Sequence, residues 1–379
     1  MQSPCKSISR VHYVGRILLV LALLCVAASQ PAFGQASQEQ PDGHQSPECT
    51  KGFTIKDLGT LPGGTFSQAA GINNRGQVAG QATNASGYEY AFLFEHGVMT
   101  DLGTLPGGNY SVGTAINNRG QVVGYAGAAN GDNHAFLFEH GVMTDLGIPP
   151  GGFGSIAYGI NDRGQVVGNA VFANGSAIGA SHAFLFEHGV MTDLGTLPGG
   201  HFSIATGINN RGQVVGYSDT NGSVYAFLYE HGVMTDLGAL PGYNYSQAFG
   251  ISDRGQVLGN SSRDGSVSSF LYEDGVMTDL SALLGGTFSA IAINNRGQVL
   301  GEGNTASGAT HAFLYEDGVI TDLGTLGNLP GGVSSQASVF NDRGQVAGEA
   351  TTASGDEHAV LWAPNHGKGD HDEGGHQPD

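Results

Sequence analysis

Seven copies of one unit occupy most of this chain of 379 residues. The dipeptide Asp-Leu first occurs at Asp57, and its later copies follow at spacings of 44, 44, 48, 43, 43 and 43 residues. Each copy continues with a link, usually Leu-Pro-Gly-Gly, then a serine such as Ser67, and then the tetrapeptide Arg-Gly-Gln-Val. Self-similarity at such a period is typical of solenoids and propellers.

Each copy is predicted to form four short strands. In the first copy they are residues 67–73, 77–82, 90–94 and 98–102. An Asn-Asn-Arg-Gly turn separates the first two strands and a Glu-His-Gly turn separates the last two, and Asx and Gly residues suit tight hairpins. Four short strands per repeat are typical of a propeller blade, and the small residues of the first strand suit the crowded position beside a central channel.

The ends of the repeat array favour a closed ring over the alternative, a parallel β-helix, whose coils are usually shorter. The seventh copy has a third strand, Ala359 to Trp362, but no fourth one. The missing piece stands at the front of the array, as Gly52 to Gly59. We therefore predict an all-β, seven-bladed β-propeller over residues 52–362, with four-stranded blades. The N-terminal strand would complete the last blade and close the ring, which removes exposed sheet edges.

The first residues of the chain have the pattern of an export signal. The apolar run 17–28 has twelve residues, too few for the ~20 of a membrane-spanning helix. Residues 1–34 are predicted to be a signal peptide, with cleavage after Gly34 preferred to cleavage after Ala28. The preceding basic residues are Lys6, Arg10 and Arg16. We expect a secreted or periplasmic protein without a transmembrane anchor.

Two polar segments flank the repeats and are expected to be disordered. They are the linker 35–51 and the tail 363–379, which is rich in His and Asp. A solvated tail is preferred to a weak metal site there. Signal cleavage would leave Cys49 as the one cysteine, so no internal disulfide is expected.

The charge balance limits the partners of the protein. The chain has 14 basic and 33 acidic residues, a net charge of −19, which argues against nucleic acid. Each repeat Asp stands alone, so that a turn-capping role is preferred to a calcium site, which needs several oxygen ligands. We expect a monomer with no metal and no cofactor.

The repeat motifs resemble the HAF family of probable extracellular repeats, over about residues 53 to 362. The family tripeptide starts at His134, His182 and His311, and Tyr90, Tyr225 and Ser269 replace the histidine in other copies. The resemblance implies export and a propeller-like repeat. It implies no catalytic residue and no ligand.

Seven arginines repeat once in each copy and are predicted to be structural. They share one face with the Glu-His-Gly turns, so pairing of Arg with Glu is the preferred interpretation and an anion-binding ring is the alternative. The arginines are Arg75, Arg119, Arg163, Arg211, Arg254, Arg296 and Arg343.

Aromatic residues next to the repeat serine are the candidate ligand contacts. They are expected on the face of the variable loops, the longest of which runs from Asn169 to Ser181. Packing between neighbouring blades is the alternative role. The residues are Phe66, Tyr110, Phe153, Phe202, Tyr243, Tyr245 and Phe288.

The function predicted from these features is that of an exported binding or scaffold module for a glycan or a protein. No Ser-His-Asp arrangement and no pair of catalytic carboxylates is visible in the sequence, so we predict that the protein is not an enzyme. The alternative is a hydrolase or lyase that acts on a cell-surface polysaccharide.

Overall fold

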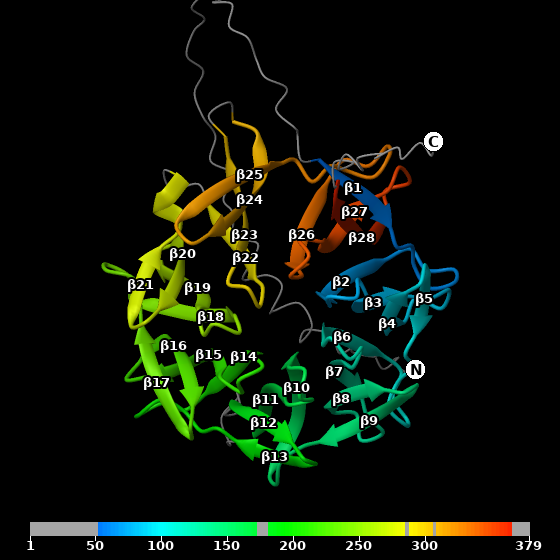
Figure 1. Ribbon diagram of the computed structural model, residues 1–379. Helices are drawn as coiled ribbons and strands as arrows, with labels where there is room; N and C mark the ends of the chain where they lie inside the picture. Colours follow the sequence, from blue (N-terminus) through cyan, green and yellow to red (C-terminus); the bar gives the residue numbers. More distant parts are fainter. Residues whose placement is uncertain (1–51, 173–180, 285–287, 306–307, 366–379) are drawn as a thin grey trace, which may run out of the picture. The chain divides into compact units, whose positions relative to one another are not determined.

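The computed structural model describes residues 52–172, 181–284, 288–305 and 308–365. These residues form 28 β-strands in seven four-stranded antiparallel sheets, arranged as blades around a centre (Figure 1). The prediction of a seven-bladed propeller is confirmed. The predicted signal peptide, the linker and the tail from residue 366 onwards lie outside the described residues.

Blade one shows the construction of every blade. Its strands, from the centre outwards, are β2 (Ser67–Ile72), β3 (Val78–Thr83), β4 (Glu89–Glu95) and β5 (Val98–Asp101). Each end of these strands lies within one residue of the predicted end. The positive φ of Gly76, 78°, matches the predicted tight turn between β2 and β3.

The other blades repeat this order. Blade two has β6 (Ser111–Ile116), β7 (Val122–Gly127), β8 (Asn133–Glu139) and β9 (Val142–Gly147). Blade three has β10 (Gly152–Ile160), β11 (Val166–Phe172), β12 (Ser181–Glu187) and β13 (Val190–Asp193). Blade four has β14 (Ser203–Ile208), β15 (Val214–Thr220), β16 (Ser223–Glu230) and β17 (Val233–Gly238).

Blade five has β18 (Tyr245–Ile251), β19 (Val257–Arg263), β20 (Ser266–Glu273) and β21 (Val276–Asp279), followed by the 3₁₀ turn η1 (Ser281–Leu284). Blade six has β22 (Ser289–Ile293), β23 (Val299–Asn304), β24 (Thr310–Glu316) and β25 (Val319–Gly324). Blade seven has β26 (Ser335–Phe340), β27 (Val346–Thr351), β28 (Glu357–Pro364) and, as its outer strand, β1 (Phe53–Asp57).

Apolar clusters between neighbouring blades form the core. Val167 and Ala183 of blade three, for example, share one buried cluster with Phe227 of blade four. Phe227 is completely buried, and such burial stabilises the fold by about 1.5–3 kcal/mol. The second strand must carry glycine beside this cluster, because a Cβ atom on Gly216 would lie 1.9 Å from the carbonyl oxygen of Ile204.

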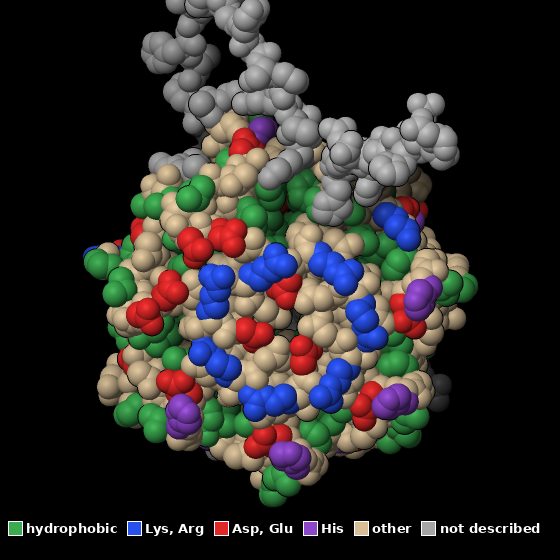
Figure 2. Space-filling model, viewed as in Figure 1, with side chains coloured by type: hydrophobic (Ala, Val, Ile, Leu, Met, Phe, Trp, Pro, Cys, Tyr) green, Lys and Arg blue, Asp and Glu red, His purple; other side chains and the backbone are tan. Residues whose placement is uncertain are grey.

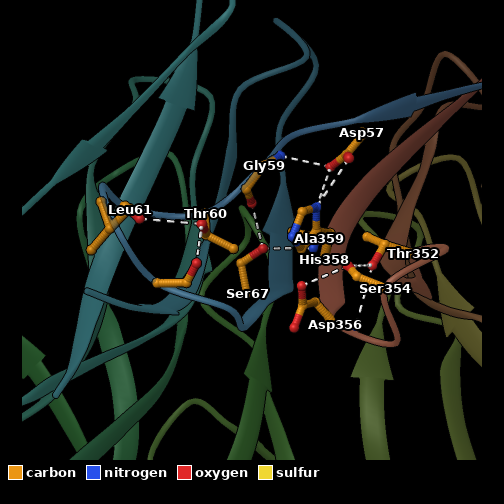
Figure 3. A network of polar contacts seen from close by, with 11 residues as sticks. Asp57, Gly59, Thr60, Leu61, Ser67, Thr352, Ser354, Asp356, His358 and Ala359 are labelled. Atoms are coloured by element: carbon orange, nitrogen blue, oxygen red, sulfur yellow. Dashed lines mark hydrogen bonds and ion pairs between the residues drawn. The ribbon is translucent and has the colours of Figure 1, made fainter. Parts of the chain in front are cut away.

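The two ends of the array meet in blade seven (Figure 3). Strand β1 pairs antiparallel with β28. The buried Ser67 Oγ donates to the carbonyl oxygen of Gly59 (2.6 Å) and accepts from the backbone N–H of Ala359 (2.7 Å). The equivalent serines bond in the same way at the four following junctions, from Ser111 to Ser246.

The predicted start of the disordered tail at residue 363 was wrong. Ala363 pairs with Thr54, Pro364 pairs with Phe53, and the N–H of Asn365 donates to the Gly52 carbonyl oxygen (2.8 Å). Strand β28 therefore continues past Trp362, because β1 offers it a partner to that point.

A ring of amide hydrogen bonds joins the blades near the channel. Asn73 Nδ2 of blade one donates to the carbonyl oxygen of Asn117 in blade two (2.9 Å). Asn341 Nδ2 of blade seven closes the ring on the carbonyl oxygen of Asn73 (2.9 Å). The other donors of this amide ring are Asn117, Asn161, Asn209 and Asn294.

A second ring runs parallel to the amide ring. The backbone N–H of Asn74 donates to Asn118 Oδ1 (2.8 Å), and the N–H of Asp342 donates to Asn74 Oδ1 (2.9 Å). Four equivalent bonds connect further blades. The Asn-Asn-Arg-Gly turns therefore join blades as well as strands.

Both rings are interrupted between blades five and six. Ser252 stands where the other blades carry the amide donor, and its Oγ accepts from the N–H groups of Arg254 and Gln256 in its own turn (3.2 Å each). Among the described residues, no bond of either ring crosses this junction. Strand β22 also has five residues where β2 has six.

Deleting residues 35–59 should expose the outer edge of β28. It also removes Asp57, whose Oδ1 lies 2.9 Å from His358 Nδ1, and the Gly59 carbonyl group that accepts from Ser67. At about 1 kcal/mol for each lost hydrogen bond, we expect a loss of roughly 3–5 kcal/mol and aggregation through the free edge. Thermal unfolding and light scattering measure both effects. A monomeric truncated protein with an unchanged melting temperature would contradict this role of β1.

Replacing Ser252 with Asn should restore the missing amide donor to Asn294. We expect a gain of about 1 kcal/mol in the free energy of unfolding. Asn117→Ser makes the reverse change at a complete junction and should cost at least as much, because it leaves a buried carbonyl group without its donor. Chemical denaturation of both variants tests the comparison, and equal effects of one sign would contradict it.

Candidate functional site

The two ends of the ring have different composition. We call the end with the Leu-Pro-Gly-Gly links and the loops between second and third strands the link face, and the opposite end the turn face. On the link face, the N–H of Ala85 donates to the Pro62 carbonyl oxygen (3.1 Å). On the turn face, Gln77 Nε2 donates to Glu95 Oε2 (2.5 Å). The predicted grouping of links with variable loops is therefore correct.

A cavity of about 130 Å³ opens at the centre of the turn face. Figure 2 shows this face, with basic side chains in a ring around the central hollow. Most of the Asx residues of the two hydrogen-bonded rings line the cavity together with Ile72, Ile116, Ile160, Ile208, Ile293 and Phe340. Asp162 and Asp342 already accept amide hydrogen bonds there, so the carboxylates of this wall have partners within the protein.

The seven repeat arginines are exposed, and the predicted pairing with the turn glutamates was wrong. Among the described residues, no Arg–Glu ion pair occurs, and glutamine side chains bond five of the six turn glutamates instead. Arg75, Arg163 and Arg211 reach the turn of the next blade, where Arg163 Nε donates to the Asn210 carbonyl oxygen (2.8 Å). Arg254 instead forms an ion pair with Asp317 of blade six (3.5 Å). A Cβ atom on Gly255 would lie 2.4 Å from Arg211 Nη2, so that glycine leaves room for the guanidinium group.

The repeat histidine that precedes Ala-Phe bonds within its own blade. His134 Nδ1 lies 2.8 Å from Asp145 Oδ2, and Asp145 Oδ1 accepts from the N–H of Gly147 (2.7 Å). The predicted turn-capping role of the repeat Asp is thus confirmed. The prediction that Ser269 replaces the histidine was wrong by one residue. Ser268 occupies the position of the histidine, and its Oγ donates to Asp279 Oδ1 (2.6 Å).

The predicted aromatic contacts fall into three groups. Phe153 is 53% exposed on the link face. Phe288 is 2% exposed in the core, so its prediction as a ligand contact was wrong. The shorter β22 moves Phe288 into the position that Ser67 has in blade one, since Ser289 pairs with Glu302 as Gln68 pairs with Gln81. The partly buried members are Phe66, Tyr110, Phe202, Tyr243 and Tyr245.

Two of the partly buried aromatics pack within their own blades. Tyr110 meets Tyr125 with ring centroids 6.4 Å apart, and Phe202 meets Tyr217 at the same distance. Both pairs are edge-to-face, with interplanar angles of 74° and 76°. Tyr243 packs against the core cluster of blade five.

A variable row of polar side chains, which the repeat motifs do not reveal, lies beside these aromatics. Each member occupies the last position of the Val-Xaa-Gly-Xaa pattern in a second strand and pairs with the inner strand near the link face. The members are Gln81, Tyr125, Asn169, Tyr217, Asn260, Glu302 and Glu349. Their signal in the sequence is variation at one position of an otherwise repeated strand. Asn169, expected in a loop, belongs to β11.

Burial shifts the acidity of several of these groups. It raises the pKa of Tyr125 and of Tyr217 to about 12. It also raises the pKa of Glu302, although the Ala337 N–H donates to that carboxyl, and the pKa of Glu349, although Gln68 donates to it. Perturbed pKa values of partly buried groups are frequent at functional sites.

The link face also exposes large apolar residues. Phe153 (53%) and Val333 (85%) occupy positions that are polar in other blades, such as Thr65 and His201. Further exposed members are Tyr88, Val267 and Leu283. The exposed valines near the turn face, such as Val98, recur in the same place from blade to blade.

Comparisons with known proteins identify the fold. No protein-family model and no curated protein matches the sequence. The β-propeller domain of the Trilobed protease from Pyrococcus furiosus, described as having an open velcro topology, is similar over 78% of this chain and 95% of that one, with 11% identity and a TM-score of 0.50. Aleuria aurantia lectin matches 70% of this chain and 97% of its own, with 12% identity and a TM-score of 0.36.

The described residues contain no helix long and apolar enough to cross a membrane. They also contain no group of three or more His, Cys, Asp or Glu side chains placed to hold a metal ion.

Phe288→Ala and Phe153→Ala should differ sharply in their effect on stability. Truncating the buried ring should cost roughly 3–5 kcal/mol, whereas truncating the exposed ring should cost at most about 0.5 kcal/mol. Denaturant unfolding of the two variants measures the difference. Equal losses would show that Phe153 belongs to the core.

Proposed function

We propose that this protein is an exported, monomeric, non-catalytic propeller of the HAF type that binds or scaffolds a glycan or protein ligand. The ligand contacts the link face. The protein acts outside the cytoplasm, in the periplasm or beyond the cell.

The observation that carries this proposal is the distribution of variation around the ring. Most of the repeated Asn, Ser, Gln, Glu and Asp side chains have partners inside the protein, and repeated arginines such as Arg163 lie over the next turn. The residues that depart from the repeat, namely the variable row and exposed groups such as Phe153 and Val333, lie on the link face or beside it. Varied residues on a rigid scaffold are where binding usually concentrates.

A second candidate function is hydrolysis or elimination on a cell-surface polysaccharide. Glu302 and Glu349, in neighbouring blades, are partly buried carboxyls with a raised pKa, which a general acid requires. Release of reducing or unsaturated sugar ends from polysaccharides, abolished by Glu302→Gln, would favour this function over binding alone.

A glycan-array screen and a partner screen with the exported protein test the binding function. For any ligand found, the Phe153→Ala and Val333→Ala variants should each weaken binding about threefold to tenfold, on the scale of a lost apolar contact. Val98→Ala is the matched control, because it truncates an exposed apolar side chain (60% exposed) near the turn face.

The melting temperatures of all three variants should equal that of the parent protein. A ligand whose affinity falls with Val98→Ala but not with the link-face variants would place binding on the turn face and overturn the proposal.

A further inference from the structure

Blades two to four carry an arc of aromatic rings in or beside their two innermost strands. The Tyr110–Tyr125 pair of blade two and the Phe202–Tyr217 pair of blade four have the same edge-to-face geometry, with centroids 6.4 Å apart. The same geometry thus recurs in two blades that have blade three between them (Figure 1).

Tyr158 of blade three lies between the two pairs. It stands on the inner strand β10, at the irregularity between Ala157 and Gly159. The pKa of Tyr158 is raised, mainly by burial and further by the neighbouring Tyr217 and Tyr125. The three tyrosines are therefore neighbours from three blades, each partly buried and each ending in a phenol group that donates and accepts hydrogen bonds.

The facing part of the ring carries amides and carboxyls instead of aromatic rings. Glu349 of blade seven accepts from Gln68 Nε2 of blade one (2.8 Å), and Gln81 Nε2 donates to Gln68 Oε1 (3.2 Å). Glu302 of blade six accepts from the backbone N–H of Ala337. The sevenfold repeat is thus broken into an aromatic side and a carboxyl side.

The charges of this region disfavour an anionic ligand. The two acidic residues of the variable row, Glu302 and Glu349, would repel a uronate or sulfate group. Among the described residues of the link face, Arg263 and His201 have acidic partners, Asp264 and Asp219 respectively. The histidines at the start of the third strands, such as His134, also have an Asp partner. The seven repeat arginines belong to the turn face.

A neutral sugar chain fits this combination of groups. Its ring faces present C–H groups that pack on aromatic rings, and its hydroxyl groups need donors and acceptors such as phenols, amides and carboxyls. A protein partner would need a broad contiguous surface. The exposed apolar residues of the link face come from separate blades, so glycan is the ligand class that the geometry favours.

We propose that the ligand is a neutral glycan, held between the tyrosine arc of blades two to four and the carboxyl side of blades six and seven. This inference rests on the proposed binding function and names the ligand class for it. Tyr125, Tyr158 and Tyr217 supply the packing surface, and Glu302, Glu349 and Gln68 supply hydrogen bonds.

Isothermal titration calorimetry of the exported protein tests the inference. The neutral probes are cellohexaose, maltohexaose and chitohexaose, and the acidic probe is oligogalacturonate. At least one neutral probe should bind, and the acidic probe should bind at least about tenfold more weakly, because of the two carboxyls.

Variants taken from the repeat itself locate the site. Tyr125→Gln and Tyr217→Gln introduce into blades two and four the residue that blade one has at this strand position, Gln81. Each variant should bind the neutral probe about tenfold more weakly. Tyr125→Phe keeps the ring and should lose at most about threefold. If a Gln variant unfolds, the double variant Glu302→Gln, Glu349→Gln serves instead, and it should increase the affinity for oligogalacturonate.

The outcomes separate this inference from the proposed function. Tighter binding of the acidic probe would overturn the neutral-glycan site, and so would unchanged affinities in the folded Tyr→Gln variants. Either result leaves the link-face binding function to be tested separately by the Phe153 and Val333 variants. Capture of a protein partner with no binding of any sugar probe would also overturn the neutral-glycan site. Loss of neutral-probe affinity at an unchanged melting temperature would support it.

Discussion

The amide hydrogen bond from one blade to the carbonyl group of the next is the interaction on which the ring depends. Asn73 shows its full chemistry: Oδ1 accepts from the N–H groups of Arg75 and Gln77, which fixes its own turn, while Nδ2 donates to Asn117 in blade two. One buried side chain therefore sets both the hairpin and the distance to the next blade. Because an unpaired buried carbonyl is costly, the six junctions that have this asparagine depend on it.

This dual use explains why the repeat is so regular and why it says little about binding. The serine at Ser67, the Asp at Asp145 and the glutamine at Gln77 also satisfy groups within or between blades. A residue that repeats in every blade meets a requirement that recurs in every blade. In a ring, that requirement is to form the turns and to join neighbouring blades. Recognition of a ligand needs an asymmetric set of groups, so it falls to positions where the repeat varies.

The sequence was sufficient for the fold because period, turn residues and strand pattern agree. It was insufficient for side-chain partners. The prediction placed Arg and Glu correctly on one face. It did not show that Gln77, which lies on the same face, would donate to Glu95 in place of an arginine. Phe288 was misplaced because one residue is missing from β22, which shifts the register by one. The variable row was missed because its side chains are partly buried by contacts with neighbouring blades. The pattern of residues along a single strand does not reveal such contacts.

The number of hydrogen bonds between neighbouring blades does not follow the covalent connection of the chain. Blades seven and one meet at the ends of the repeat array, yet their junction has both hydrogen-bonded rings, the Ser67 bonds and the pairing of β1 with β28. Blades five and six are joined by a short covalent link, yet Ser252 and the shorter β22 leave both rings open there. The exposed Arg254–Asp317 ion pair (3.5 Å) and the bond from the Ala290 N–H to Ser269 Oγ (2.9 Å) still cross this junction. Since neither replaces the two missing rings, local opening should begin at this junction rather than at the chain ends.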